Sequence, residues 1–143
     1  MTSLFRAILA SAAIAAALVV SPALAETMSF KADLKSGPGV SPTTGQGNLA
    51  ATYDTETRKL SWKGTVSGLS GNVTAAHFHG PAEPGQNAGV LIPAAGVKTG
   101  DFEGSATLSN DQGKVVTAEK TYFMVHTAAN PGGEVRGHVT KGQ

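Results

Sequence analysis

Cysteine is absent from the 143 residues of this sequence. Its absence excludes disulfide bonds, thiolate metal ligands and cysteine nucleophiles. A domain without disulfides must be held together by its hydrophobic core, which is feasible for a chain of about 120 residues. A metal ion bound only by the folded state would add to that stability.

Net charge is also nearly absent, because the 11 Lys and Arg residues are balanced in number by 10 Asp and Glu residues. A nucleic-acid-binding protein needs a clustered basic surface, so we expect no nucleic-acid partner. No nucleophile elbow, phosphate-binding loop or pair of catalytic carboxylates stands out either. These absences exclude several common functions, and the sequence identifies no protein partner.

Long hydrophobic runs are confined to the N-terminus. Arg6 is followed by an apolar run over residues 7–20, then by Pro22 and the Ala-Leu-Ala of residues 23–25, which matches a signal-peptide cleavage site. A membrane anchor is the alternative, but the run is short for a span of roughly 20 residues. We therefore expect a signal peptide over residues 1–25 and one exported domain over residues 26–143. Its composition is typical of a bacterial protein, so the destination is the periplasm or the outside, with no membrane span after cleavage.

The expected domain is all-β, because apolar and polar residues alternate with a period of two and helical periodicity is rare. The strands are expected at residues 28–34, 49–53, 60–66, 73–79, 89–92, 102–108, 122–127 and 134–140. About eight short strands at this spacing predict a Greek-key antiparallel sandwich or flattened barrel. Only residues 109–118 are ambiguous, since Ser109 and Gln112 could open a helical turn with a capping box.

All four histidines lie in the C-terminal half, at His77, His79, His126 and His138. Side chains two residues apart on a strand point to the same face, so His77 and His79 can reach one ion while Phe78 faces the core. His126 is expected to point to the outer face as well, because its apolar neighbours Phe123 and Val125 have the opposite parity on the strand.

The last strand is expected to present its polar residues on the face that carries the histidines. Alternation assigns Val135, Gly137 and Val139 to the core and Glu134, Arg136 and His138 to that outer face. Three or four imidazoles on adjacent strands, without a thiolate, suit copper and, less well, zinc. The predicted ligands are His77, His79 and His126, with His138 as an optional fourth. The alternative is that the histidines only form hydrogen bonds that hold strands together.

Two further residues bear on chemistry at such a site. Arg136 carries a permanent positive charge and could guide a small anion to the metal. Its alternatives are a cross-strand ion pair or a side chain packed on Tyr122. Met124 shares the face of His126 and could be a soft ligand for Cu(I), although simple packing is the alternative.

Residues 76–81 (Ala-His-Phe-His-Gly-Pro), 125–127 (Val-His-Thr) and 130–137 (Asn-Pro-Gly-Gly-Glu-Val-Arg-Gly) resemble the two signature blocks of the CHRD (chordin-type) domain. The resemblance extends over nearly all of the expected mature chain. It implies an all-β, immunoglobulin-like domain of the kind found in chordin and in many bacterial exported proteins. Members more often carry glutamine at the position of His138.

A more distant resemblance is to copper-zinc superoxide dismutase, in which an H-x-H pair, a later histidine and an arginine follow the order seen here at His77, His79, His126 and Arg136. Residues 81–108 contain no histidine and the cysteines are missing, so this resemblance implies at most a copper-only site. Three functions follow as hypotheses: a copper-binding protein with superoxide dismutase-like activity, a copper carrier or buffer without turnover, and an interaction module without metal. Whether the protein is an enzyme stays open at this point.

Overall fold

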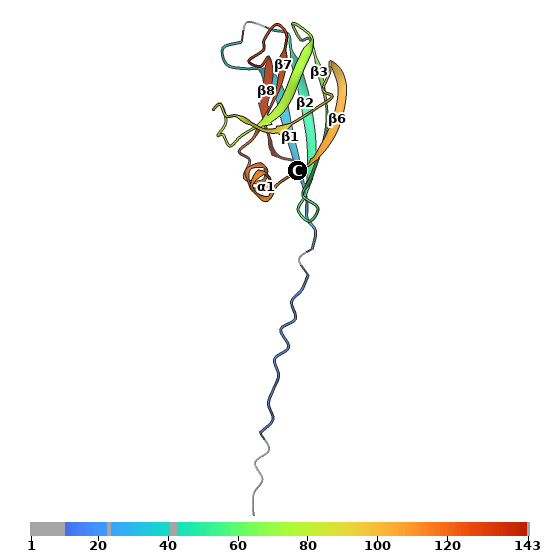
Figure 1. Cartoon of the computed structure of the whole chain (residues 1–143), viewed down its shortest axis with the longest axis vertical. Helices are drawn as coiled ribbons and strands as arrows, with labels where there is room; N and C mark the ends of the chain where they lie inside the picture. The colour runs from blue at the N-terminus through green and yellow to red at the C-terminus, as the bar shows by residue number, and fades with distance from the viewer. Residues whose placement is uncertain (1–10, 23, 41–42, 143) are drawn as a thin grey trace, which may run out of the picture.

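A computed structural model describes residues 11–22, 24–40 and 43–142 of the chain. Arg6 and Ala23, which belong to the expected signal peptide, lie outside the described residues, as do residues 7–10. Residues 11–22 form neither helix nor strand and are exposed, and Figure 1 shows them leading away from the domain. The single described helix has eight residues, and no described helix has the length and hydropathy of a transmembrane segment.

The described domain is built from nine strands and one short helix, which confirms the predicted all-β class. The strands are β1 (Thr27–Ser36), β2 (Gln46–Asp54), β3 (Lys59–Ser67), β4 (Val73–His79), β5 (Val90–Pro93), β6 (Gly100–Thr107), β7 (Tyr122–Thr127), β8 (Val135–His138) and β9 (Thr140–Lys141), and the helix is α1 (Asn110–Thr117). The extra strand relative to the prediction is the two-residue β9, which pairs with β1.

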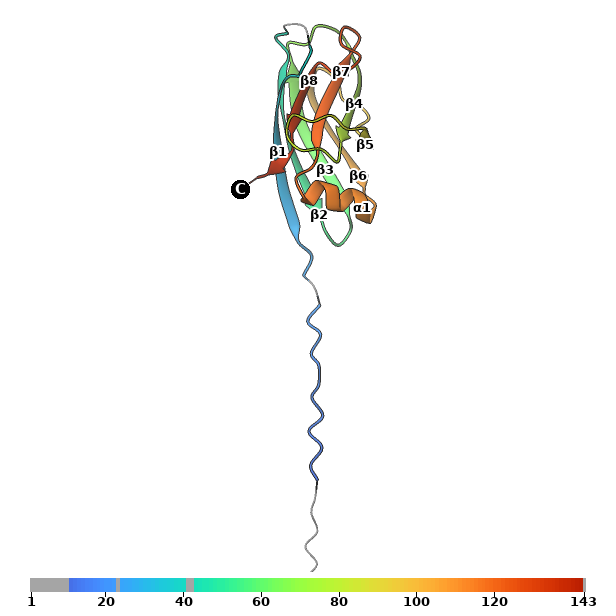
Figure 2. The ribbon, with the colours of Figure 1, turned by 90° about the vertical axis from the view of Figure 1, so that its left-hand side faces the viewer.

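The strands form one antiparallel sheet in the order β5-β4-β7-β8-β1-β2-β3-β6. β1 joins the two halves, because it pairs with β2 along most of its length and with β8 at its C-terminal end. The sheet curls into a nearly closed, flattened barrel (Figures 1 and 2). The chain crosses between the halves after β3, β5 and β6, and these long crossovers place β4 beside β7, which follows it by more than 40 residues.

Phe78 lies at the centre of the core and is fully buried. Its ring meets Trp62 at a centroid distance of 5.2 Å and Phe123 at 4.9 Å, both edge to face. Aromatic pairs in this geometry contribute about 0.5–1.5 kcal/mol each beyond their burial. Because neighbouring side chains on a strand point to opposite faces, burial of Phe78 turns both His77 and His79 away from the core.

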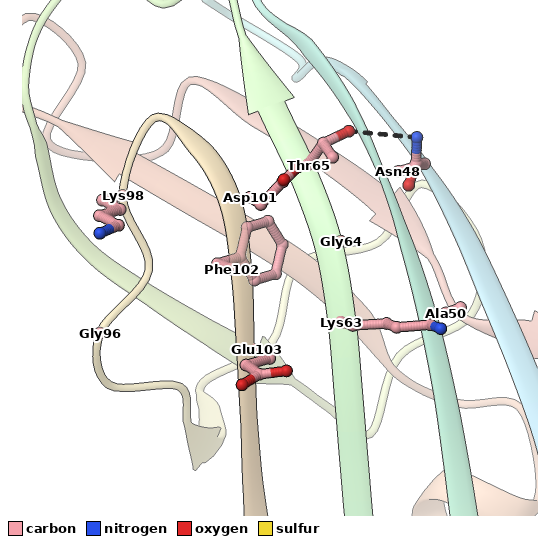
Figure 3. A pocket seen from close by; sticks show the side chains of 10 residues that line it. All are labelled: Asn48, Ala50, Lys63, Gly64, Thr65, Gly96, Lys98, Asp101, Phe102 and Glu103. Carbon is pink, nitrogen blue, oxygen red and sulfur yellow. Dashed lines mark hydrogen bonds between the residues drawn. The ribbon is translucent and has the colours of Figure 1, made fainter.

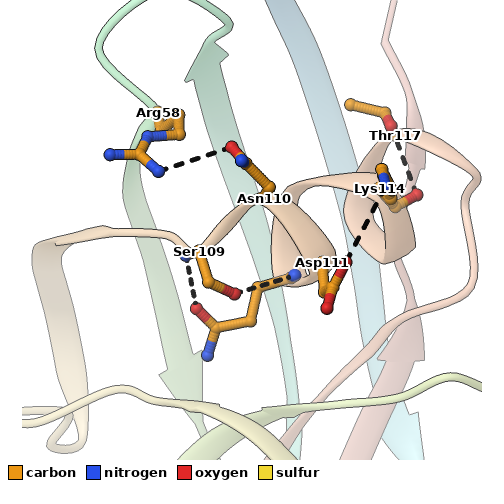
Figure 4. Close-up of polar contacts among 7 residues, drawn as sticks. Arg58, Ser109, Asn110, Asp111, Lys114 and Thr117 are labelled. Carbon is orange, nitrogen blue, oxygen red and sulfur yellow. Dashed lines mark hydrogen bonds and ion pairs between the residues drawn. The ribbon is translucent and has the colours of Figure 1, made fainter.

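The ambiguous stretch after β6 forms α1, which begins with the capping box that its sequence suggested (Figure 4). The Ser109 hydroxyl accepts from the Gln112 N–H at 3.1 Å, and the Gln112 side chain accepts from the Ser109 N–H at 2.9 Å. The Gln112 amide also donates to the carbonyl of Leu91 at 2.8 Å, which ties the helix to β5. At Gly113 a Cβ atom would lie only 2.3 Å from the Tyr53 hydroxyl, so the glycine permits this close packing.

Candidate metal centre

The three predicted ligands meet on the outer face of two neighbouring strands. In the β4–β7 register His77 lies opposite Met124, and His126 lies opposite Ala75. One ring nitrogen from each of His77, His79 and His126 lies within 4.8 Å of the other two. Nitrogens bound to one ion at about 2 Å are at most about 4 Å apart, so small ring movements would bring all three to a single ion. The predicted clustering of these histidines is confirmed.

Backbone carbonyls hold two of the three imidazoles in one tautomer. His79 Nδ1 lies 3.0 Å from the carbonyl oxygen of Ala88, and His126 Nδ1 lies 2.9 Å from that of Pro131. A carbonyl oxygen can only accept, so both Nδ1 atoms carry the proton and donate it. Each Nε2 atom is then left with a lone pair, which is the arrangement typical of metal-ligating histidines.

The lone pair of His79 Nε2 has no hydrogen-bond partner among the described residues although the atom is buried. A buried polar atom without a partner costs about 1–3 kcal/mol, so it calls for an explanation such as an ion. His77 Nδ1 lies 3.2 Å from His126 Nε2, and it can donate its own proton there when no ion is bound. The donor set and the unpartnered nitrogen therefore fit a metal ion.

Electrostatics favour neutral rings. Burial lowers the pKa of His77, and the nearby His126 lowers it further. Burial also lowers the pKa of His79, against the opposing effect of its hydrogen bond to the Ala88 carbonyl. A neutral imidazole is the form that binds metals, so both rings are ready to act as ligands at neutral pH.

Arg136 lies on the predicted outer face and packs on Tyr122. Its guanidinium carbon is 3.5 Å from the centroid of the Tyr122 ring. Its Nη1 donates to the Asn87 side chain at 2.8 Å and its Nη2 to the Gln86 carbonyl at 2.7 Å. Packing on Tyr122, one of the predicted alternatives, is therefore what the structure shows.

A pocket of about 260 Å³ opens beside the histidine cluster. His79, His126 and Arg136 line it, together with Met124 and Tyr122. Two of the five guanidinium N–H groups are used in the hydrogen bonds to the loop, so others remain for a molecule in this pocket. The arrangement leaves an approach to the metal ligands from solvent.

His138 lies outside the cluster. It stands on β8 opposite Tyr122, which in turn stands opposite His79 on β4, so the β7 strand separates the two histidines. Two strand spacings amount to about 10 Å, too far for a shared ion at these positions. The Nε2 atom of His138 instead donates to the carbonyl of Glu119 at 2.6 Å.

Glu134 corrects one expectation from the sequence. Alternation assigned it to the outer face beside Arg136, but its side chain is fully buried. It precedes the first residue of β8 and follows Gly133, whose φ of 118° turns the chain before the strand begins. The regular alternation therefore does not extend to this position.

The buried carboxylate of Glu134 joins three loops through four hydrogen bonds. The donors are the side chains of Thr127, Asn130 and Thr43 and the backbone N–H of Ser70, at 2.8–3.1 Å. Burial by itself would raise the pKa, but the hydrogen bonds, led by that from Ser70, outweigh it and lower the pKa of Glu134 to about 2. Glu134 thereby holds the turn whose Pro131 carbonyl orients His126.

A second, larger hollow of about 690 Å³ lies over β2, β3 and β6 (Figure 3). Its charged side chains are Lys63, Lys98, Asp101 and Glu103. Their charges cancel, and the hollow is lined by no histidine among the residues that the structure describes. It offers neither a ligand cluster nor a net field, so the histidine cluster is the candidate site.

Comparison with known proteins agrees with the resemblance seen in the sequence. The model of the CHRD domain family matches residues 30–139, which include the three clustered histidines, Glu134 and Arg136. The search of curated proteins found no significant match. Since the family model spans well over half of the sequence, the chain belongs to the CHRD domain family.

Proposed function

We propose that this protein is an exported CHRD-domain protein that binds one copper ion through His77, His79 and His126. The observation that carries the proposal is the clustering of three imidazoles, two of which have their Nδ1 protons committed to carbonyls. Neutral imidazoles are good ligands for copper and zinc. The ligands come from two strands of a rigid sheet, which favours a preformed site.

Met124 supports copper over zinc. It is 8% exposed, lies opposite His77 in the strand register and lines the pocket with His79 and His126. Thioether sulfur is a soft donor that selects Cu(I), whereas zinc sites rarely use it. A methionine beside three imidazoles therefore suits an ion that changes between Cu(II) and Cu(I).

The N-terminal apolar segment supports export. Within the described part of this segment Ile14, Leu18, Val19 and Val20 are each at least 86% exposed, so these side chains are not part of the core of the domain. A segment that is removed after export needs no place in that core. We therefore propose cleavage after residue 25 and a periplasmic or secreted location.

A superoxide dismutase-like activity is the second candidate function, and the pocket beside the histidines favours it. A bound copper ion would supply Cu(II)/Cu(I) redox chemistry there. The chain itself would contribute neutral ligands, an opening of about 260 Å³ for a small anion, and the permanent charge of Arg136. A carrier or buffer would use the same ligands without turnover.

Titration calorimetry with Cu(II) and with Zn(II) tests the proposal. The purified protein should bind one copper ion, and His77→Ala or His126→Ala should abolish this binding. The matched control is His138→Ala, which removes an imidazole outside the cluster and should retain it. Thermal melting verifies that each variant folds. If the wild-type protein binds neither metal, the copper proposal fails and an interaction module without metal remains.

Activity separates the two copper functions. Dismutation of superoxide is measured on the copper-loaded protein against an equal concentration of free Cu(II). Activity above that of the free ion supports catalysis. Activity no greater than that of the free ion supports a carrier.

A further inference from the structure

Residues 86–88 form a short loop segment beside the cluster, here named the 86–88 segment. The Ala88 carbonyl accepts from His79 Nδ1 and from the Tyr122 hydroxyl, each at 3.0 Å. The Ala88 N–H also lies 3.0 Å from the Tyr122 hydroxyl oxygen. Gln86 and Asn87 accept the two hydrogen bonds from Arg136. The segment is thus bonded to one metal ligand and to the two side chains next to it.

Backbone hydrogen bonding between the two ends of this loop reaches only as far as Gly89, whose carbonyl accepts from the Gly80 N–H at 3.2 Å. Residues 80–89 contain no strand, and Gln86 and Asn87 are exposed. The backbone hydrogen bond of Gln86 is local, to Glu83 at 3.0 Å. The Ala88 carbonyl is therefore placed by the bonded Gly89 on one side and, among the described side chains, by Arg136, Tyr122 and His79.

The same three side chains are stacked across three adjacent strands. The rings of His79 and Tyr122 are parallel within 2°, with centroids 4.9 Å apart. The Arg136 guanidinium lies against the Tyr122 ring at 3.5 Å. The planar guanidinium stacks on the ring and at the same time donates two hydrogen bonds in a fixed fork. Lysine, which carries a single ammonium group, cannot make this combination of contacts.

We infer that Arg136 is a positioning residue, which anchors the 86–88 segment on Tyr122 so that the Ala88 carbonyl keeps His79 in the Nδ1–H tautomer. In this tautomer Nε2 is free to bind the metal. The inference rests on the proposed function only for the identity of the ion, because the tautomer of His79 is a property of the metal-free protein. It assigns to Arg136 a role different from that of an anion guide.

Two variants and a control separate these roles. Arg136→Met removes the charge and the fork, whereas Arg136→Lys keeps the charge and loses the fork. The matched control is Lys35→Met, because Lys35 is exposed on β1, lies opposite Arg136 in the register and has no contact with the 86–88 segment among the described contacts. Asn87→Ala, an exposed substitution that removes one hydrogen bond from Arg136, provides a variant with little risk to folding.

Long-range ¹H–¹⁵N correlation spectra of the imidazoles, recorded at pH 8 on the metal-free protein, report the tautomer of each ring. We expect pure Nδ1–H for His79 and His126 in the wild-type protein and in Lys35→Met. Both Arg136 variants, and Asn87→Ala to a smaller extent, should show a mixture with the Nε2–H form at His79. His126 is the internal control, because its partner is the Pro131 carbonyl and it should not change.

Copper affinity provides the second measurement. Loss of a residue that orients a metal ligand typically lowers affinity 10–100-fold, so both Arg136 variants should lose affinity by about this factor. If Arg136→Lys and Arg136→Met retain the wild-type tautomer of His79, the inference is overturned. If the tautomer changes as expected but the wild-type protein binds no copper, the inference holds and the proposed function fails.

Discussion

Replacing Glu134 with glutamine removes the buried charge at the junction of three loops while keeping the shape of the side chain. The hydrogen bonds lower the pKa of this carboxyl from 4.5 to about 2. A shift of this size corresponds to about 3 kcal/mol of folding free energy at neutral pH, since one pKa unit is about 1.4 kcal/mol. The free energy of unfolding should therefore fall by about 3 kcal/mol at pH 7 in Glu134→Gln.

The effect should depend on pH with a definite sign. A carboxyl whose pKa is lowered by folding stabilises the protein fully above its unfolded pKa, and this stabilisation is lost as the pH falls through the folded pKa. Between pH 4.5 and pH 2 the contribution should decline, and at pH 3 it should be about 1.4 kcal/mol. The difference between wild type and Glu134→Gln should accordingly shrink by more than half from pH 7 to pH 3.

Urea unfolding followed by the fluorescence of Trp62, the single tryptophan, measures both quantities. Glu103→Gln is the matched control, because Glu103 is exposed on β6 and should show little effect at either pH. For a domain of this size 3 kcal/mol corresponds to a decrease in Tm of roughly 10 °C or more. A difference between wild type and Glu134→Gln that stays the same from pH 7 to pH 3 would refute the assignment of the stabilisation to the ionised carboxylate.

Three further outcomes are expected. Met124→Leu, with Met28→Leu as control, should lower Cu(I) affinity in a competition assay with a chromophoric chelator and leave Cu(II) affinity nearly unchanged; equal loss for both ions would contradict a thioether ligand. Because burial lowers the pKa of His77 and that of His79 below the ordinary 6.5, proton competition with copper at these two ligands should begin at a lower pH than for a free imidazole, measured as copper affinity against pH. Gly113→Ala should destabilise the fold by about 1–3 kcal/mol in thermal or urea unfolding, because its methyl group would overlap the tyrosine hydroxyl on β2; a stability gain from helix propensity would disprove that contact.

The sequence by itself determined the features that depend on neighbouring residues. Alternation with a period of two identified the strands and the buried face, and the burial of Phe78 followed from it. The same parity turned His77 and His79 outward together. The capping box of Ser109 and Gln112 indicated the start of a helical turn, because both partners lie within four residues.

Tertiary structure decided which strands are neighbours, since strand pairing joins residues far apart in the chain and depends on how the whole sheet closes. It placed His126 beside His77 and left His138 on the far side of Tyr122. The alternation along each strand predicts that His77, His126 and His138 all point to the outer face. It could not predict which of these histidines lie close together.

The residues that orient the histidine ligands could not be predicted from the sequence either. The Ala88 and Pro131 carbonyls belong to loops, where no periodicity predicts direction. The burial of Glu134 required donors from three separate loops to converge on one carboxylate. The sequence thus determined which residues could bind a metal, and only the closure of the barrel and the packing of its loops decided which of them form one site.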